Sequence, residues 1–359
     1  MSNSLQLTNI GELVTANSAG VERYQNSSLC IEDGKISSIS DRNGDQIIDC
    51  GGKMVTAGFV DSHTHPVFYN KRDEEYRMRL AGATYEEIAE KGGGIISSVE
   101  GVRNASKEAL VEKVMQRMDR FIAGGTTTIE AKSGYGLNTD SELKSLSVID
   151  EVNQNHPIDM VPTFMGAHAF PKEFSNDHDA YIDLICNEMI PAVTDQGVAI
   201  FNDVFCEDKY FTVDQSRRIL EAGREHGLKP RLHADEFVDS GAAVLAGEIN
   251  AFSADHLMAV SEIGIRSIVD NDVVATLLPG TTFFLGKSNY APARKLIDNN
   301  VTVALATDFN PGSSHIQSMP FIMTLACMHM EMTVEEAFQS ATYNGAKALG
   351  MENEIGSIE

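Results

Sequence analysis

The segment Lys229-Pro-Arg-Leu-His-Ala-Asp-Glu236 is a short strand-like run that ends in a histidine and two acidic residues. Two other strand-like runs end in a comparable way: one leads into His63-Thr-His65, and another ends at Asp308 in Ala-Leu-Ala-Thr-Asp. Polar, chemically active side chains therefore stand at the ends of runs that are far apart in the chain. Such a pattern is typical of a fold in which many strands end at one common face.

Strands and helices alternate from residue 54 onward. The expected strands are short and β-branched: Met54–His63, Thr126–Ser133, Met160–His168, Ala199–Cys206, Lys229–Glu236, Ala251–Leu257, Asp272–Pro279 and Val301–Asp308. The expected helices have apolar residues three and four positions apart: Lys107–Ala123, Ser141–Asn155, Tyr181–Val193, Val213–His226, Val260–Val269, Ile316–Met330 and Val334–Leu349. Eight strands, each followed by a helix, predict an α/β fold, a (β/α)8 TIM barrel with its site at the carboxyl ends of the strands.

The first 53 residues have a different pattern. They contain short expected strands separated by the turn signals Asp33-Gly34 and Asn43-Gly44: Leu5–Ile10, Ser28–Asp33, Lys35–Ser40 and Gln46–Cys50. We therefore expect three parts: a small β-sandwich-like domain over residues 1–53, the barrel over 54–350, and the start of a return to the small domain over 351–359.

Three strand-end histidines and one aspartate indicate a metal site. His63 and His65 are two positions apart on a strand, so they point to the same face, and burying both without a partner would be costly. His233 and Asp308 end two further strands, and His256 ends another. Neutral imidazoles with a carboxylate are the ligand set of a catalytic divalent metal ion, usually zinc, with one position left open for water.

Composition narrows the function classes. The chain has 359 residues, with 28 basic and 52 acidic side chains and a formal net charge of −24. This charge argues against binding nucleic acid or an anionic membrane, and an anionic substrate would need local cations. No apolar run approaches the ~20 residues of a membrane span. The start of the chain lacks the pattern of a signal peptide, so we expect a soluble, cytoplasmic protein.

Several motifs resemble one enzyme family. The run Gly58-Phe-Val-Asp-Ser-His-Thr-His65 is similar to the metal signature of the amidohydrolase superfamily. More specifically, five runs resemble the imidazolonepropionase family: Arg77-Met-Arg-Leu-Ala-Gly-Ala-Thr-Tyr85, Glu130-Ala-Lys-Ser-Gly-Tyr-Gly136, His233-Ala-Asp-Glu236, Tyr290-Ala-Pro-Ala-Arg294 and Asp308-Phe-Asn-Pro-Gly-Ser-Ser314. The resemblance covers essentially the whole chain.

The resemblance implies hydrolysis of the cyclic amide of 4-imidazolone-5-propanoate to N-formimidoyl-L-glutamate, a step of histidine degradation. It implies one metal ion, zinc or iron, with these ligands: His63, His65, His233 and Asp308. Glu236 would take the proton of the attacking water and return it to the ring nitrogen. His256 would orient the water or stabilise the oxyanion, although in many relatives the histidine of this strand is a ligand.

The resemblance also implies contacts with the substrate. Arg72 would bind the propanoate through two parallel hydrogen bonds. The other implied substrate contacts are Tyr85, Tyr135, His168, Glu236, Asn310, Gly312 and Ser313. Without the resemblance, the dense charge run around Arg72 would more often be a solvated loop. Relatives of this kind are often dimers, which allows a homodimer, and they continue beyond Glu359 with strands that complete the small domain. We therefore expect those strands to be missing here.

Alternatives remain open from the residues themselves. One is a metal-dependent deaminase of the same superfamily that acts on nucleobase-like rings, which lack a carboxylate for Arg72. Another is a non-catalytic relative, which would lack a ligand or Glu236. Lys132, at the end of the second strand, suggests the carbamylated lysine of two-metal relatives, but theirs belongs to the fourth strand. That strand here ends in Val204-Phe-Cys206, so a single-metal site is favoured.

Overall fold

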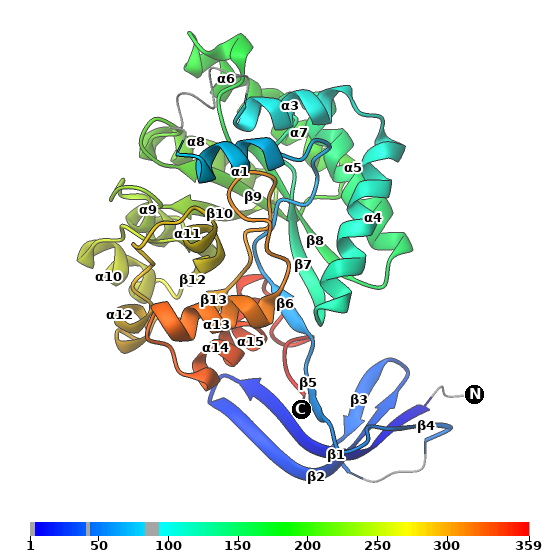
Figure 1. Cartoon of the computed structure of the whole chain (residues 1–359). Coiled ribbons are helices and arrows are strands. Elements are labelled where there is room, and N and C mark those ends of the chain that lie inside the picture. The colour runs from blue at the N-terminus through cyan, green and yellow to red at the C-terminus, as the bar shows by residue number, and fades with distance from the viewer. Residues whose placement is uncertain (1–3, 41–43, 83–92, 359) are drawn as a thin grey trace.

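The larger part of the molecule is a barrel of parallel strands. The computed structural model describes residues 4–40, 44–82 and 93–358. Its eight-stranded sheet runs from β6 to β13, each strand hydrogen-bonded to its sequence neighbour. The strands are β6 Phe59–Asp61, β7 Thr126–Lys132, β8 Asp159–Ala167, β9 Phe201–Cys206, β10 Lys229–Ala234, β11 Ser253–His256, β12 Val274–Leu277 and β13 Val303–Leu305. Helices surround them (Figure 1), which confirms the predicted barrel class.

Contacts just beyond the first and last strands bring the two ends of this sheet together. Thr64 and Phe309 form a parallel bridge. The backbone N–H of His65 donates to the Phe309 carbonyl at 2.8 Å, and that of Asp308 donates to the His63 carbonyl at 3.1 Å. These bonds place the His63-Thr-His65 segment directly beside Asp308.

Helices follow the strands as predicted, with some differences in their bounds. They are α1 Asp73–Leu80, α3 Ile95–Asn104, α4 Lys107–Ala123, α5 Thr139–Asn155, α6 His178–Leu184, a π-helix Ile185–Met189, α7 Ile190–Gln196, α8 Val213–Glu225, α9 Ala242–Glu248, α10 Glu262–Asp270, α11 Pro279–Phe284, α12 Ala293–Asp298, α13 Met319–His329, α14 Val334–Ser340 and α15 Tyr343–Ala348, with a 3₁₀ turn at Lys172–Phe174. None of these helices is long and apolar enough to cross a membrane, as far as the described part of the chain extends.

The helix predicted over Val334–Leu349 is wrong in one respect, because it is divided into α14 and α15. The Ala341 carbonyl, at the division, accepts the backbone N–H of Val60 at 2.9 Å. A carbonyl bonded to the first barrel strand is turned away from the helix, so the helix is interrupted there.

The small domain is built on a long hairpin. Its five-stranded sheet has the order β3-β2-β1-β4, with β5 also paired to β1. The strands are β1 Ser4–Asn17, β2 Gly20–Glu32, β3 Lys35–Ser38, β4 Gln46–Asp49 and β5 Met54–Thr56. The first two strands are much longer than predicted, because Val14 and Ala16 continue β1 and pack with Phe338 of α14. Asp33 and Gly34 have φ of 50° and 79°, as the expected tight turn requires. Asn43 lies outside the described residues.

The chain passes from the small sheet to the barrel within the run predicted as one strand, Met54–His63. That prediction is wrong, because β5 pairs with β1 of the small sheet and β6 pairs with β7 of the barrel. Between them, a Cβ on Gly58 would lie 2.1 Å from Thr127 Oγ1, so only glycine fits this passage. The chain end returns to the small sheet, where Ile358 donates its N–H to Thr15 Oγ1 at 2.7 Å. We propose a domain boundary near residue 57.

One buried hydrogen bond supports an irregular part of the barrel. The register of β8 against β9 shifts between Phe164 and Ala167, and the Gly166 carbonyl there accepts the hydroxyl of Tyr181 at 2.7 Å. Tyr181→Phe removes this donor from a fully buried site, so we expect the free energy of unfolding to fall by about 1–3 kcal/mol. Denaturant unfolding measures the change. Tyr69→Phe, at a side chain 38% exposed, is the control, and equal stability of the two variants would contradict the assignment.

Candidate metal centre and active site

Three imidazole nitrogens and one carboxylate oxygen converge at the carboxyl end of the barrel. His65 Nε2 lies 3.3 Å from His63 Nε2 and 3.4 Å from His233 Nε2. Asp308 Oδ1 lies 3.5 Å from Nε2 of both His63 and His65. A tetrahedral ion with bonds of about 2.0–2.1 Å would separate its ligand atoms by about 3.3–3.4 Å. These distances fit one small divalent metal ion among His63, His65 and Asp308, with His233 Nε2 beside His65.

Carboxylates behind the histidines set the direction of their nitrogens. His63 Nδ1 donates to Asp255 Oδ2 at 2.7 Å, and His233 Nδ1 donates to Asp203 Oδ1 at 3.0 Å. A neutral imidazole that donates from Nδ1 keeps its lone pair on Nε2. The Nε2 lone pairs of these two rings are thus free to face the centre. Such lone pairs would repel one another unless a cation lay between them.

Burial keeps the histidines neutral. It lowers the pKa of His63, His65 and His256 well below the ordinary value, because a charged imidazolium would lose its hydration there. Burial also lowers the pKa of His168 to about 3. Neutral imidazoles are the form that binds a metal ion.

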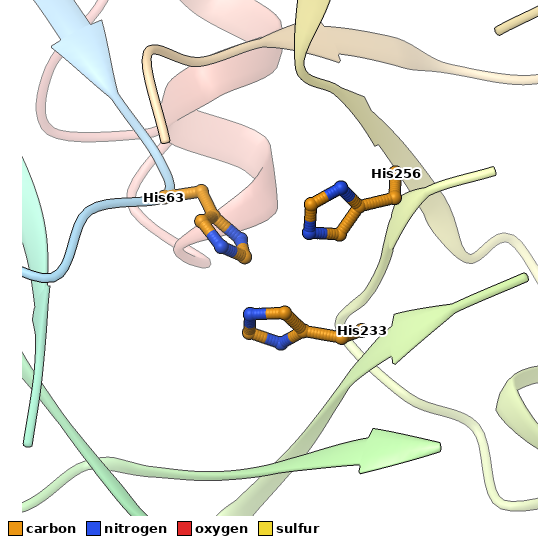
Figure 2. Close-up of side chains that lie close together, drawn as sticks. All are labelled: His63, His233 and His256. Atoms are coloured by element: carbon orange, nitrogen blue, oxygen red, sulfur yellow. The ribbon is translucent and has the colours of Figure 1, made fainter. Parts of the chain in front are cut away.

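His63, His233 and His256 form another group that could hold a metal ion, because one nitrogen of each ring lies within 4.8 Å of the others. Figure 2 shows His63, His233 and His256 pointing toward one another from different parts of the barrel. The ring centroid of His256 lies 5.5 Å from that of His63 and 5.2 Å from that of His233. A φ of 77° turns His256 inward, a conformation that is strained for a residue with a Cβ. The structure therefore brings His256 to the centre, where it could bind an ion or a water.

Glu236 is the buried carboxylate beside this group. Its Oε2 lies 3.8 Å from His256 Nε2. Burial, reinforced by the negative charge of Asp308, raises the pKa of Glu236 to about 8. Burial also raises the pKa of Asp308 to about 6. A carboxyl group that can gain and lose a proton near neutral pH suits a general acid and base.

Arg72 lies at the start of α1, and its side chain is only 14% exposed. Its Nε and Nη2 donate to the carboxylate of Glu75, at 2.9 Å and 2.6 Å. Nη1 lies close to the Asp308 loop, because a Cβ on Gly312 would come within 2.3 Å of it. The interpretation of Arg72 as part of a solvated loop is therefore wrong. One edge of the guanidinium is held by Glu75, and Nη1 lies against Gly312.

The aromatic rings of Tyr135 and His168 lie beside the ligand candidate His65. The Tyr135 ring is buried, with its centroid 6.0 Å from that of His65 and 5.1 Å from that of His168. His168 stacks on His65 with centroids 5.0 Å apart and donates from Nδ1 to the Gly134 carbonyl. Tyr85, also predicted here, lies outside the described residues.

Asn310 organises the loop that follows Asp308. Its Nδ2 donates to the Asp308 carbonyl at 2.7 Å and to Ser313 Oγ at 2.8 Å. Its Oδ1 accepts the backbone N–H groups of Gly312 and Ser313. These bonds hold the loop beside Asp308, and Gly312 of the loop lies next to Arg72 Nη1.

Sequence reasoning missed the residues that support the ligands. Besides Asp203 and Asp255, Thr281 was not predicted, although its hydroxyl donates to Asp308 Oδ2 at 2.5 Å. The available signal was a carboxylate inside an apolar strand: Asp203 within Phe201-Asn-Asp-Val-Phe-Cys206, and Asp255 directly before His256. A buried carboxylate needs a partner, so such a position indicates an internal contact.

Known proteins resemble this chain in sequence over most of its length. The model of the amidohydrolase family matches residues 54–359. An imidazolonepropionase from Geobacillus thermodenitrificans is 50% identical over 346 residues, which are 93% of this chain and 81% of that protein. An imidazolonepropionase from Alkaliphilus metalliredigens is 50% identical over 313 residues, which are 87% of this chain and 74% of that protein.

Solved structures of more distant proteins share the fold. A guanine deaminase from C. acetobutylicum has a TM-score of 0.71 at 18% identity, covering 99% of this chain and 88% of its own. An adenosine deaminase from Xanthomonas campestris with bound zinc has a TM-score of 0.72 at 18% identity, covering 99% and 82%. The matches at about half identity are far more specific. The chain therefore belongs to the amidohydrolase family and, within it, to the imidazolonepropionases.

Proposed function

We propose that this chain hydrolyses 4-imidazolone-5-propanoate to N-formimidoyl-L-glutamate in histidine degradation. One observation carries the chemistry: three imidazole nitrogens and an aspartate oxygen converge beside a buried glutamate with a raised pKa. The substrate is supported by relatives about half identical that bear the name imidazolonepropionase. An arginine at the mouth of the same site suits the propanoate.

We propose that one divalent ion, zinc or iron, is held by these residues: His63, His65, His233 and Asp308. When bound, such an ion would lower the pKa of a water ligand to roughly 7. The carboxylates Asp203 and Asp255 orient two of the ligand histidines from behind.

Glu236 is proposed to move the protons. As a carboxylate it accepts the proton of the attacking water, and as a carboxylic acid it donates that proton to the ring nitrogen that leaves. Its burial supports both forms near neutral pH. His256, 3.8 Å from Glu236, is proposed to orient the water or stabilise the oxyanion.

Arg72 is proposed to bind the propanoate of the substrate. Its Nη1 lies beside Gly312 while Glu75 holds the opposite edge. The remaining substrate contacts are proposed from Tyr85, Tyr135, His168, Glu236, Asn310, Gly312 and Ser313. A cytoplasmic location and a homodimer are further proposals of the same family assignment.

The direct test is loss of the imidazolone ultraviolet absorbance when metal-loaded protein is added to fresh 4-imidazolone-5-propanoate. Guanine and cytosine are offered in parallel, with ammonia release as the readout. Decay of the imidazolone without ammonia supports the proposed function. A folded, metal-loaded sample that leaves the imidazolone intact and releases ammonia from a nucleobase would favour a deaminase.

Glu236→Gln keeps the shape of the side chain but cannot accept a proton. We expect kcat to fall by about 10²–10⁴-fold, because general acid–base catalysis is lost, while the metal content stays unchanged. Steady-state kinetics and metal analysis measure both. Glu225→Gln, an exposed residue at the end of α8, is the control. A fall below tenfold in kcat would contradict the role of Glu236.

Arg72→Ala removes the proposed partner of the propanoate. Hydrogen bonds to charged groups contribute about 1.5–3 kcal/mol, so KM should rise by about 10–100-fold. The control is Arg77→Ala on the same helix, whose side chain is 74% exposed and pairs with Glu74. An equal effect of the two substitutions on KM would show that Arg72 acts only through the general charge of the helix.

Metal uptake should release protons near neutral pH. With a pKa of about 8, Glu236 is mostly protonated at pH 7 in the metal-free chain, and a nearby dication favours its ionised form. Lower pH therefore stabilises the metal-free form, so the affinity for Zn²⁺ should fall from about pH 8.5 to about pH 6.5. Chelator competition measures this, with calorimetry in two buffers to count protons. Glu236→Gln should lose most of the proton release, and an affinity independent of pH would refute the prediction.

A further inference from the structure

Lys132 is a buried cation close to the proposed metal ligands, because it binds the carboxylate of Asp203 that holds His233. It is the last residue of β7, and its side chain is fully buried together with those of Glu130 and Asp203. Its Nζ donates to Glu130 Oε1 at 2.7 Å and to Asp203 Oδ2 at 2.6 Å. Three charges taken out of water are stable only when they compensate one another closely.

The two carboxylates bound to Lys132 reach different metal ligands. Asp203 Oδ1 accepts both the Nδ1–H and, at 3.2 Å, the backbone N–H of His233. Glu130 Oε2 accepts the backbone N–H of Thr64 at 3.1 Å. Thr64 stands between His63 and His65, so Glu130 holds the ligand-bearing segment after β6, and Asp203 holds the ligand on β10.

The backbone of β7 reinforces this arrangement. The Lys132 N–H donates to the Thr64 carbonyl at 3.0 Å, and the Thr64 hydroxyl donates to the Glu130 carbonyl at 2.6 Å. Thr64 is thus fixed through its N–H, its carbonyl and its hydroxyl. The side-chain link from Thr64 through Glu130 and Lys132 to Asp203 joins the ligands after β6 to the ligand on β10.

Lys132 is not suited to be a carbamylated metal ligand. The charges of Asp203 and Glu130 raise the pKa of Lys132 despite burial, which alone would lower it. A carbamate would place a third negative charge against these two carboxylates. The ammonium form fits the surroundings, and it already has both carboxylates as acceptors.

We propose that Lys132 is a positioning residue of the metal centre, whose ammonium group fixes the ligands on two strands relative to one another without contacting the ion. Without it, Glu130 and Asp203 would repel each other or take up a proton. Either change disturbs the acceptors of Thr64 and His233. The partners behind metal ligands typically change metal affinity by about 10–100-fold.

Arg231 supports the proposed ligands in a comparable way but reaches fewer of them. Its Nη2 donates to Asp255 Oδ2 at 3.2 Å and to the Ser62 carbonyl at 2.8 Å, and Asp255 in turn orients His63. Arg231 therefore supports one ligand histidine through its side-chain contacts. Through Glu130 and Asp203, Lys132 reaches two ligand-bearing segments, whereas the contacts of Arg231 lead only to the segment of His63, so Lys132 is the better subject for a test.

The test measures Co²⁺ binding by visible absorption and Zn²⁺ affinity by chelator competition. Lys132→Met combined with Glu130→Gln removes the bridge but keeps the buried net charge, since one cation and one anion are lost together. We expect affinity to fall by about 10–100-fold and the Co²⁺ spectrum to change in shape. Lys132→Arg, which keeps the charge in a different geometry, should recover part of both.

Lys144→Met is the matched control. Lys144 is a partly buried lysine whose Nζ donates to the carbonyls of Arg103 and Ala105, so its loss affects stability without reaching the metal centre. A folded double variant with wild-type affinity and spectrum would overturn the proposal. If the double variant does not fold, Lys132→Arg decides: a lower affinity with an altered spectrum supports the proposal, and wild-type values contradict it.

The proposal rests on the metal ligands of the proposed function, and the two can fail separately. A wild-type chain that binds neither Zn²⁺ nor Co²⁺ would contradict the proposed function itself. A wild-type chain that binds tightly, with variants that bind equally well, would contradict only the role of Lys132.

Discussion

The two backbone hydrogen bonds between the His63-Thr-His65 segment and the Asp308-Phe309 segment are the contact on which the site depends. They join the ends of an eight-stranded sheet whose first and last strands are about 245 residues apart in the sequence. Closure of the barrel and assembly of the ligand set are therefore one event. A chain that failed to close its barrel would lose the fourth ligand together with its last strand contact.

A buried centre lined with imidazoles also needs negative charge behind it. Asp203 and Asp255 supply hydrogen-bond acceptors, and Lys132 and Arg231 hold these carboxylates in place. These internal ion pairs and hydrogen bonds explain why charged residues occur within otherwise apolar strands.

The sequence predicted the barrel class and the residues that converge at the mouth of the barrel. Histidines and aspartates at strand ends are rare, because burying them without partners costs free energy. It predicted α4 with its bounds, because the apolar residues of Lys107–Ala123 recur with clear helical spacing. It could not show that Met54–Thr56 belongs to the small sheet, because the residue pattern of a strand does not reveal which other strand it pairs with. The long β1–β2 hairpin was missed because much of β2 is exposed and polar.

The sequence also could not predict the contacts among the residues that support the ligands. Lys132 and Asp203 are 71 positions apart, and only the neighbouring placement of β7, β8 and β9 in the barrel brings them into contact. The sequence showed a charged residue in each strand but not which opposite charge would compensate it. Pairing of this kind is a property of strand order and tilt, not of local pattern.

Glu75 occupies one edge of the Arg72 guanidinium before any substrate arrives. Opening the cyclic amide creates a carboxylate and at the same time frees a basic amidine nitrogen that takes up a proton, so the net charge of the product equals that of the substrate. A guanidinium whose other edge is held by Glu75 has room for one carboxylate only. Arg72 should therefore hold the propanoate equally before and after ring opening, and it should not retain the product through the carboxylate that the reaction creates.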